Sequence, residues 1–162
     1  MKILFLCTHN RCRSILAEAI ANHFGADLIL AASAGSDPAG QVHPLTLYYL
    51  QQCHIPSEGL RSKSWDEMAD FEPDYVITLC DSAAGESCPV WLGNTRTIHW
   101  GLPDPSAVNA DEQSVAEAFL GVIEILKCRI MQIRYWLEQG LPPEQIQQKM
   151  LRPAVSGPIE LA

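Results

Sequence analysis

The sequence predicts a single α/β domain, in which a four-stranded parallel sheet is flanked by helices. Four short apolar runs, of the kind that parallel sheets bury on both faces, occur at 2–6, 28–32, 75–79 and 96–99. Helical patterns lie between or after these runs, and this alternation favours right-handed crossovers. The length of 162 residues and the hydrophobic content of 48% suit one domain with a substantial core.

The first half of the chain contains two strand–helix pairs. The strand at 2–6 leads into a helix expected at 13–24, and Gly25 behind it suits a left-handed helix cap. The strand at 28–32 is followed by a helix that begins at Pro44, since proline is favoured at the first helical position.

A third and shorter helix is expected near Ser64, with Trp65 and Met68 on its inner side. It precedes the strand at 75–79, and the last strand follows at 96–99. In such sheets the functional site lies at the carboxyl ends of the strands, so loops that are distant in sequence are expected to meet there.

The longest helix follows the last strand. Asn109 and Glu112 suggest a capping box at its start, and Gly140 marks its end. Between them, apolar residues recur every three or four positions, at Val115, Phe119, Val122, Leu126, Ile130, Ile133 and Leu137. We therefore expect a catalytic domain at 1–140 and a C-terminal extension at 141–162, with one short helix at 145–151 and a loose tail from Pro153.

The composition excludes several classes of protein. With 19 acidic against 11 basic residues the net charge is -8, which argues against binding to nucleic acid or to an anionic membrane. No run approaches the length of a membrane span, and the N-terminal strand shows no cleavage-like site, so a cytoplasmic protein is expected. The six cysteines are widely spaced and lack zinc-knuckle spacing, which favours catalytic or redox roles without a metal or other cofactor.

An oxyanion-binding loop is predicted where the first strand meets the first helix. The loop reads Cys7-Thr8-His9-Asn10-Arg11-Cys12-Arg13-Ser14. Its backbone N–H groups, the positive end of the helix and the Arg13 guanidinium can converge on one tetrahedral anion. Cys7 is expected to lie beneath that anion as the nucleophile, with its pKa lowered by the positive field and by a hydrogen bond from the Ser14 hydroxyl.

The alternative for this loop is a buried cysteine beside an ordinary arginine. It fits less well, because an arginine in the first turn of a helix opposes the helix macrodipole. Within the loop, Cys12 is expected to have a packing role, and the short amide of Asn10 to hold the loop by side-chain hydrogen bonds.

A second pair of cysteines, Cys80 and Cys88, follows the third strand and is separated by small and polar residues. Such a segment suits a thiol relay, in which each attacking sulfur must approach a different partner in line. Two thiols also supply the two electrons that a reduction needs. Asp104 precedes a proline in the loop after the fourth strand, where it is suited to act as a general acid.

Together these segments resemble the low-molecular-weight protein tyrosine phosphatase superfamily and, within it, the thioredoxin-coupled arsenate reductases. The resemblance rests on Cys-x5-Arg-Ser at 7–14, on Cys80 and Cys88, on the sequence 99–105 and on Ser33-Ala34-Gly35, and extends from Met1 to about Leu137. It implies a low-molecular-weight phosphatase-like fold and a role in arsenate detoxification.

The resemblance also implies a mechanism. Cys7 attacks arsenate while Asp104 protonates the departing oxygen, and Cys80 then attacks Cys7 so that arsenite leaves. Cys88 attacks Cys80 in turn, and thioredoxin or a glutaredoxin reduces the resulting Cys80–Cys88 disulfide. Arg13 and the loop from Thr8 to Ser14 would hold the oxyanion.

Several residues depart from the pattern of the relatives. His9 occupies the third loop position, where relatives carry glycine or another small residue, so backbone strain is expected there. Arg11 adds a charge at the mouth of the site. The interval from Cys80 to Cys88 is one residue longer than in the familiar thioredoxin-coupled members, which leaves the electron donor open.

A further departure concerns potassium, which relatives of this type bind with an asparagine, a glutamate, a serine and an aspartate. Asn10, Glu18 and Ser33 match the first three ligands, but Lys63 stands at the position of the aspartate. An ammonium group there would satisfy the same oxygens, so activity is expected to be insensitive to potassium. The alternative is that Lys63 is merely exposed on a loop.

Two other functions stay open. The first is a phosphotyrosine phosphatase, but the segment 106–108 lacks aromatic residues to stack on a phosphotyrosine ring, and Ile15 stands where that branch has proline. The second is an oxyanion or metalloid sensor without turnover. Such a sensor would need a partner surface, and the sequence shows no basic stripe or coiled coil.

Overall fold

The four strands form one parallel sheet with the order β2-β1-β3-β4. The computed structural model describes residues 1–80 and 95–151. Its strands are β1 (Lys2–Leu6), β2 (Leu30–Ala34), β3 (Tyr75–Thr78) and β4 (Arg96–His99). The predicted α/β fold with four parallel strands is therefore confirmed.

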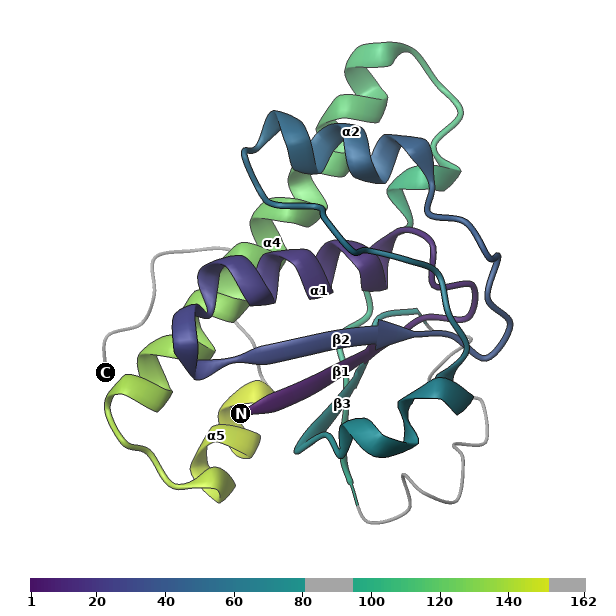
Figure 1. The fold of residues 1–162 in the computed structure, drawn as a ribbon. Helices are drawn as coiled ribbons and strands as arrows, with labels where there is room; N and C mark the ends of the chain where they lie inside the picture. The colour runs from purple at the N-terminus through teal and green to yellow at the C-terminus, as the bar shows by residue number, and fades with distance from the viewer. Residues whose placement is uncertain (81–94, 152–162) are drawn as a thin grey trace.

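Helices cover both faces of this sheet. The α-helices described are α1 (Arg13–Phe24), α2 (Pro44–Gln52), α4 (Glu112–Glu138) and α5 (Pro143–Met150). The 3-10 helices described are η1 (Ala26–Leu28), η2 (Trp65–Phe71) and η4 (Pro105–Ala107). Figure 1 shows α1, α2 and α4 stacked on one side of the sheet and the helical turn at 65–71 on the other. None of the helices in the described part of the chain is long and apolar enough to span a bilayer.

Alternating residues of β1 fill two separate cores. Ile3 and Phe5 are fully buried in the larger core, which α1, α2 and α4 cover. Leu4 and Leu6 point to the opposite face, where they pack with Met68 of η2. A central strand that is buried on both faces has little freedom to shift, so the loop that leaves its carboxyl end has a rigid base.

The second strand was placed two residues too early in the sequence. It was predicted at 28–32, but the chain forms η1 up to Leu28 and β2 runs from Leu30 to Ala34. The two leucines of this stretch are exposed, Leu28 by 37% and Leu30 by 54%, whereas Ile29 and Ser33 are buried. Small residues suit the crowded space beneath α1, and their low strand propensity hid the true end of the strand.

The helix α1 ends at the predicted residue but not by the predicted cap. Gly25 is right-handed, with φ -72°, and the left-handed residue is Ala26, with φ 51°. A glycine is needed at position 25 for space, because a Cβ atom there would lie 2.6 Å from the Cβ of Ile29.

The start of the longest helix also differs from the prediction. α4 begins at Glu112 with Asp111 at the N-cap, so Asn109 forms no capping box with Glu112. A capping box does occur between Ser64 and Glu67, where the predicted short helix forms as the 3-10 helix η2. The expected inward face of α4 is correct for Phe119, Val122, Leu126, Ile130 and Ile133, which are all buried.

The helix α5 packs against the same core as α4. Its Ile146 and Met150 are buried, the Tyr75 hydroxyl donates to the Pro143 carbonyl, and Trp100 Nε1 donates to the Met150 carbonyl. The extension thereby supports the chain immediately after β4. The loose tail predicted from Pro153 lies outside the described residues.

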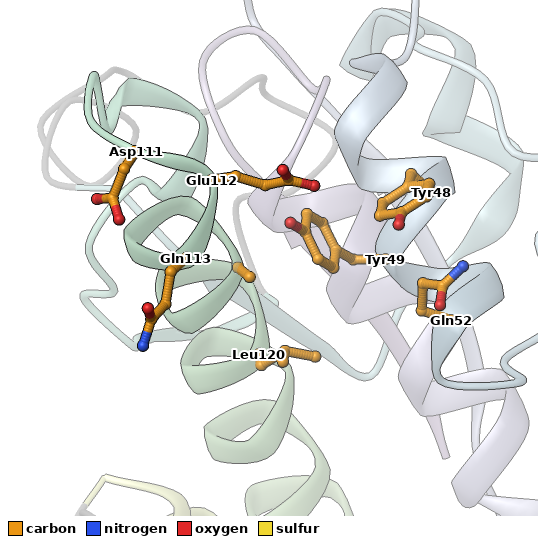
Figure 2. A pocket seen from close by; sticks show the side chains of 8 residues that line it. Tyr48, Tyr49, Gln52, Asp111, Glu112, Gln113 and Leu120 are labelled. Atoms are coloured by element: carbon orange, nitrogen blue, oxygen red, sulfur yellow. The ribbon is translucent and has the colours of Figure 1, made fainter.

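The helix α2 is held to α4 by a stacked pair of rings, Tyr49 and Phe119, with centroids 4.8 Å apart. Beside this pair lies an open groove of 610 Å³. In Figure 2, Tyr48 and Tyr49 of α2 face Glu112 and Leu120 of α4 across the groove. No predicted site residue lines it, so it is separate from the site described next.

Candidate active site

Most of the predicted site residues line one cavity of 230 Å³ at the carboxyl edge of the sheet. Three separate segments contribute to it: the loop after β1, the end of β3 and the loop after β4. The lining residues are Cys7, Thr8, His9, Asn10, Arg11, Cys12, Arg13, Cys80 and Asp104. Ser14 lies buried behind the loop, and Cys88 lies outside the described residues.

The carbonyl groups of the oxyanion-binding loop are held away from this cavity. The Thr8 carbonyl accepts a hydrogen bond from Asp37 N at 2.9 Å, and the His9 carbonyl accepts one from Ala39 N at 2.9 Å. In a planar trans peptide the next N–H points the opposite way, so the N–H groups of His9 and Asn10 are directed inward. The segment after β2 thus gives the loop a polarity that suits an anion.

Asn10, and not His9, is the strained residue of the loop. Its φ is 45°, a left-handed value that asparagine tolerates better than most residues. His9 instead has an exposed side chain, whose Nδ1 lies 3.0 Å from the Asp37 carbonyl oxygen. The expectation of strain at His9 was therefore wrong. Glycine at this position in relatives suggested a left-handed residue at His9, but the left-handed residue is the next one, Asn10.

The buried Asn10 side chain ties the loop to two other segments. Its Nδ2 donates to Ser14 Oγ at 2.7 Å, and its Oδ1 accepts from Lys63 N at 2.9 Å. The expected support of the loop by this amide is present in the structure. The hydrogen bond expected from Ser14 to Cys7 is not among the contacts of the described residues; the Ser14 hydroxyl oxygen accepts from Asn10 instead.

Arg13 stands at the start of α1 and reaches across the cavity. Its Nη1 donates to the Leu102 carbonyl at 2.9 Å, and its Nη2 lies 3.7 Å from Asp104 Oδ2. No side chain in the described part of the chain caps the N-terminus of α1, so its first N–H groups stay available to an anion. The guanidinium, the helix end and the loop N–H groups surround the same space.

Asp104 is fixed by a residue that the sequence analysis missed. Its Oδ1 accepts hydrogen bonds from Ser106 N at 3.0 Å and from Ser106 Oγ at 2.6 Å, which leaves Oδ2 directed toward Arg13. The signal was present in the sequence, because an Asp-Pro-Ser turn favours this side-chain contact with the backbone. Ser106 therefore orients the carboxyl that was predicted to be the general acid.

The thiols of Cys7 and Cys80 pack against each other at the floor of the cavity, and each residue is less than a tenth exposed. The hydrogen bond with Cys80 and the burial raise the pKa of Cys7, whereas the nearby Arg13 charge lowers it. The expected lowering of the Cys7 pKa is thus reversed in this state. Burial and the contact with Cys80 favour the protonated thiol of Cys7, and the positive charge of Arg13 only partly offsets this.

Removal of Cys80 is expected to make Cys7 easier to ionise. In a Cys80→Ala variant the largest cause that raises the Cys7 pKa is gone, so its alkylation by iodoacetamide should reach half-maximal rate at a lower pH. The rate would be followed by mass spectrometry of the Cys7 peptide, with Cys128→Ala as the control. An unchanged midpoint would show that Cys80 does not stabilise the protonated form.

Behind the loop, Lys63 occupies the position discussed above for a cation. Its Nζ lies 3.5 Å from Glu18 Oε1, and both side chains are only about a tenth exposed. Ser33 Oγ donates to the same carboxylate oxygen at 3.2 Å. The alternative of an exposed loop lysine is therefore wrong, since the Lys63 side chain is only about a tenth exposed and its ammonium pairs with Glu18, one of the residues that match the potassium ligands.

We predict that this internal ammonium makes the protein indifferent to potassium. Replacement of potassium by sodium in the assay should leave the turnover rate unchanged. In contrast, Lys63→Met should lower the free energy of unfolding by about 3 kcal/mol, because it leaves the Glu18 carboxylate buried without its partner. Urea unfolding measures this loss; a specific activation of the wild-type protein by potassium would contradict the prediction.

These features define the class of protein. A cysteine, an arginine and an oriented carboxyl that line one cavity with a loop at a helix N-terminus are suited to an enzyme that acts on a tetrahedral oxyanion. The model of the low molecular weight phosphotyrosine protein phosphatase family matches residues 2–149, and the chain belongs to this family.

Curated relatives in this family are arsenate reductases. The chain is 35% identical over 115 residues to the arsenate reductase of Halalkalibacterium halodurans, which covers 70% of this chain and 81% of the relative. It is 33% identical over 128 residues to the arsenate reductase of Staphylococcus xylosus, covering 78% and 96% of the two chains.

Solved structures agree with this relationship. An arsenate reductase in the phosphate-binding state is 29% identical, with a TM-score of 0.68, over 83% of this chain and 96% of that chain. The thioredoxin-dependent arsenate reductase of Corynebacterium glutamicum is 26% identical, with a TM-score of 0.64, over 86% of this chain and 63% of that chain.

Proposed function

We propose that this protein reduces arsenate to arsenite through a relay of cysteine thiols. The observation that carries the proposal is the contact between Cys7 and Cys80 inside an anion-binding cavity. A phosphatase that releases its intermediate to water needs only the first of these thiols. A reduction requires a second thiol in contact with the first, because the second thiol can attack the Cys7 sulfur of the adduct and form a disulfide.

In the first step the Cys7 thiolate attacks arsenic, and a sulfur–arsenic bond replaces one arsenic–oxygen bond. Asp104 gives its proton to the departing oxygen, which leaves as water. Arg13 and the inward N–H groups of the loop neutralise the charge on the remaining oxygens.

In the second step the Cys80 thiolate attacks the Cys7 sulfur. The sulfur–arsenic bond breaks, its electron pair stays on arsenic, and arsenite leaves as the reduced product. A Cys7–Cys80 disulfide remains. The Cys88 thiolate then attacks the Cys80 sulfur, which releases the Cys7 thiolate and leaves a Cys80–Cys88 disulfide.

The remaining disulfide needs an external dithiol. We propose thioredoxin as the donor, with glutaredoxin as the alternative, in keeping with the thioredoxin-dependent structural relative. Thioredoxin and glutaredoxin keep thiols reduced in the cytoplasm, so we also propose that the protein acts there. This setting keeps Cys7 and Cys80 as free thiols before arsenate binds.

The test is arsenite production from arsenate by the purified protein. Parallel assays would contain the thioredoxin system, the glutaredoxin system or neither, together with a separate assay of aryl-phosphate hydrolysis. We expect repeated turnover with one of the two donor systems. Rapid aryl-phosphate hydrolysis without any arsenite production would identify a phosphatase instead, and binding of arsenate without either reaction would identify a sensor.

A further inference from the structure

One carbonyl of the oxyanion-binding loop is held by two donors from α2. The Arg11 carbonyl accepts a hydrogen bond from His43 N at 3.0 Å and another from Thr46 Oγ1 at 3.2 Å. His43 is the N-cap of α2, and its Nδ1 in turn accepts from Leu45 N at 3.1 Å. Both contacts therefore come from the first turn of one helix, which is packed on α4 through Tyr49.

These contacts fix the orientation of the peptide between Arg11 and Cys12. With the Arg11 carbonyl held outward, the N–H of Cys12 is directed toward the cavity. If this peptide turned over, a carbonyl oxygen would face the bound anion and repel it. The cost of leaving the Arg11 carbonyl without its partners favours the anion-binding orientation.

Thr46 acts on the loop through its side chain, so a substitution can remove its contact. The carbonyls of Thr8 and His9 accept from backbone N–H groups, and the His9 carbonyl also accepts from the Ser62 hydroxyl at 3.2 Å in an exposed contact. The Thr46 side chain is fully buried, and its hydroxyl also interacts with the buried Cys12 thiol. Its two partners are thus the consecutive residues whose shared peptide must face the anion.

We propose that Thr46 is a positioning residue for oxyanion binding: its hydroxyl holds the Arg11–Cys12 peptide with its N–H toward the anion. Thr46 does not touch the anion itself and acts through the loop. The inference rests on the proposed oxyanion chemistry of the cavity, and it adds a residue from α2 to a site whose other parts come from loops and from α1.

The test compares Thr46→Val, which keeps the shape of the side chain but removes the hydroxyl, with Thr46→Ser, which keeps the hydroxyl. Thr97→Val serves as the matched control, because Thr97 lies exposed on β4, and its hydroxyl contacts only the carbonyl of Thr95 among the described residues. The first readout is the dissociation constant of inorganic phosphate, measured by calorimetry. The second is kcat and KM for arsenate, and urea unfolding records the stability of each variant.

We expect Thr46→Val to weaken phosphate binding and to raise the KM for arsenate by about tenfold, the effect of one net hydrogen bond, while kcat changes much less. Thr46→Ser should restore both values, and Thr97→Val should match the wild type. If Thr46 had only a structural role, Thr46→Val would lower stability without raising KM more than it changes kcat. Wild-type phosphate affinity in folded Thr46→Val, or failure of Thr46→Ser to restore it, would overturn the inference.

The same assays separate this inference from the proposed function. If wild-type protein binds neither phosphate nor arsenate, the oxyanion chemistry of the cavity is wrong and Thr46 has nothing to position. If wild-type protein binds phosphate and Thr46→Val binds it equally well, only the role of Thr46 is wrong. Should Thr46→Val fail to fold, Thr46→Ser and Thr46→Ala provide the comparison with and without the hydroxyl.

Discussion

Replacing Cys7 with serine is expected to abolish arsenate reduction and any hydrolysis of aryl phosphates, with a loss of about 10⁴-fold or more in kcat. The reason is chemical, since a serine hydroxyl in the same place is a far weaker nucleophile than a thiolate and cannot form a disulfide with Cys80. The fold should persist, because the substitution exchanges one small buried atom for another at the end of a rigid strand.

The measurement is arsenite production with the donor system, together with aryl-phosphate hydrolysis and calorimetric phosphate binding. Phosphate binding should survive, because the N–H groups of the loop and Arg13 are unchanged. Cys128→Ser is the control, since Cys128 is a partly exposed thiol on α4 away from the cavity. Substantial activity of Cys7→Ser in either reaction would remove Cys7 from the role of nucleophile.

Arg13→Lys is expected to lower kcat/KM for arsenate by about 10²- to 10³-fold, the range seen when one oxyanion-stabilising donor is lost. The guanidinium of Arg13 donates to the Leu102 carbonyl through one nitrogen and approaches Asp104 through another. A lysine ammonium is a single point charge and cannot hold these groups and two oxygens of the anion together.

The matched control is Arg61→Lys, because Arg61 forms an exposed ion pair with Glu67 outside the cavity. Steady-state kinetics with arsenate and urea unfolding of both variants give the comparison. Arg61→Lys should behave as the wild type in both measurements. A normal kcat/KM in Arg13→Lys would mean that the fork geometry of the guanidinium is unimportant and that any positive charge suffices.

Local sequence was enough to predict the centre of the site. The strand at 2–6, the loop and the first helix are consecutive, and the rule that sites lie at carboxyl ends of parallel strands brought Cys80 and Asp104 to the same edge. These predictions depend only on element order and on motif chemistry, so small errors in the bounds of β2 did not disturb them.

The contacts that give the loop its polarity were not predictable in the same way. Asp37, Ala39 and Thr46 act on the loop through atoms of the backbone or through one hydroxyl, and nothing in their residue types announces such a role. The direction of the Cys7 pKa shift also differs from the expectation, because the expectation considered only the positive field of the motif. The opposing effect of Cys80 depends on a contact between residues far apart in the sequence.

The left-handed position in the loop shows a further limit. Comparison with relatives pointed to His9, but the strain falls on Asn10, whose side chain is held by Ser14 and by the backbone of Lys63. The sequence showed that a short amide would brace the loop without showing where the backbone turns. The position of the left-handed residue depends on which loop carbonyls accept hydrogen bonds from the segment after β2.

A single measurement decides whether Cys7 and Cys80 act as successive thiols. Reduced protein carrying Cys88→Ser would receive one pulse of arsenate, free thiols would be alkylated, and disulfides would be mapped by mass spectrometry. We predict a Cys7–Cys80 disulfide together with one equivalent of arsenite, and neither of them in Cys80→Ser. Continued turnover in both variants, or arsenite release without this disulfide, would contradict the relay and with it the assignment as a reductase.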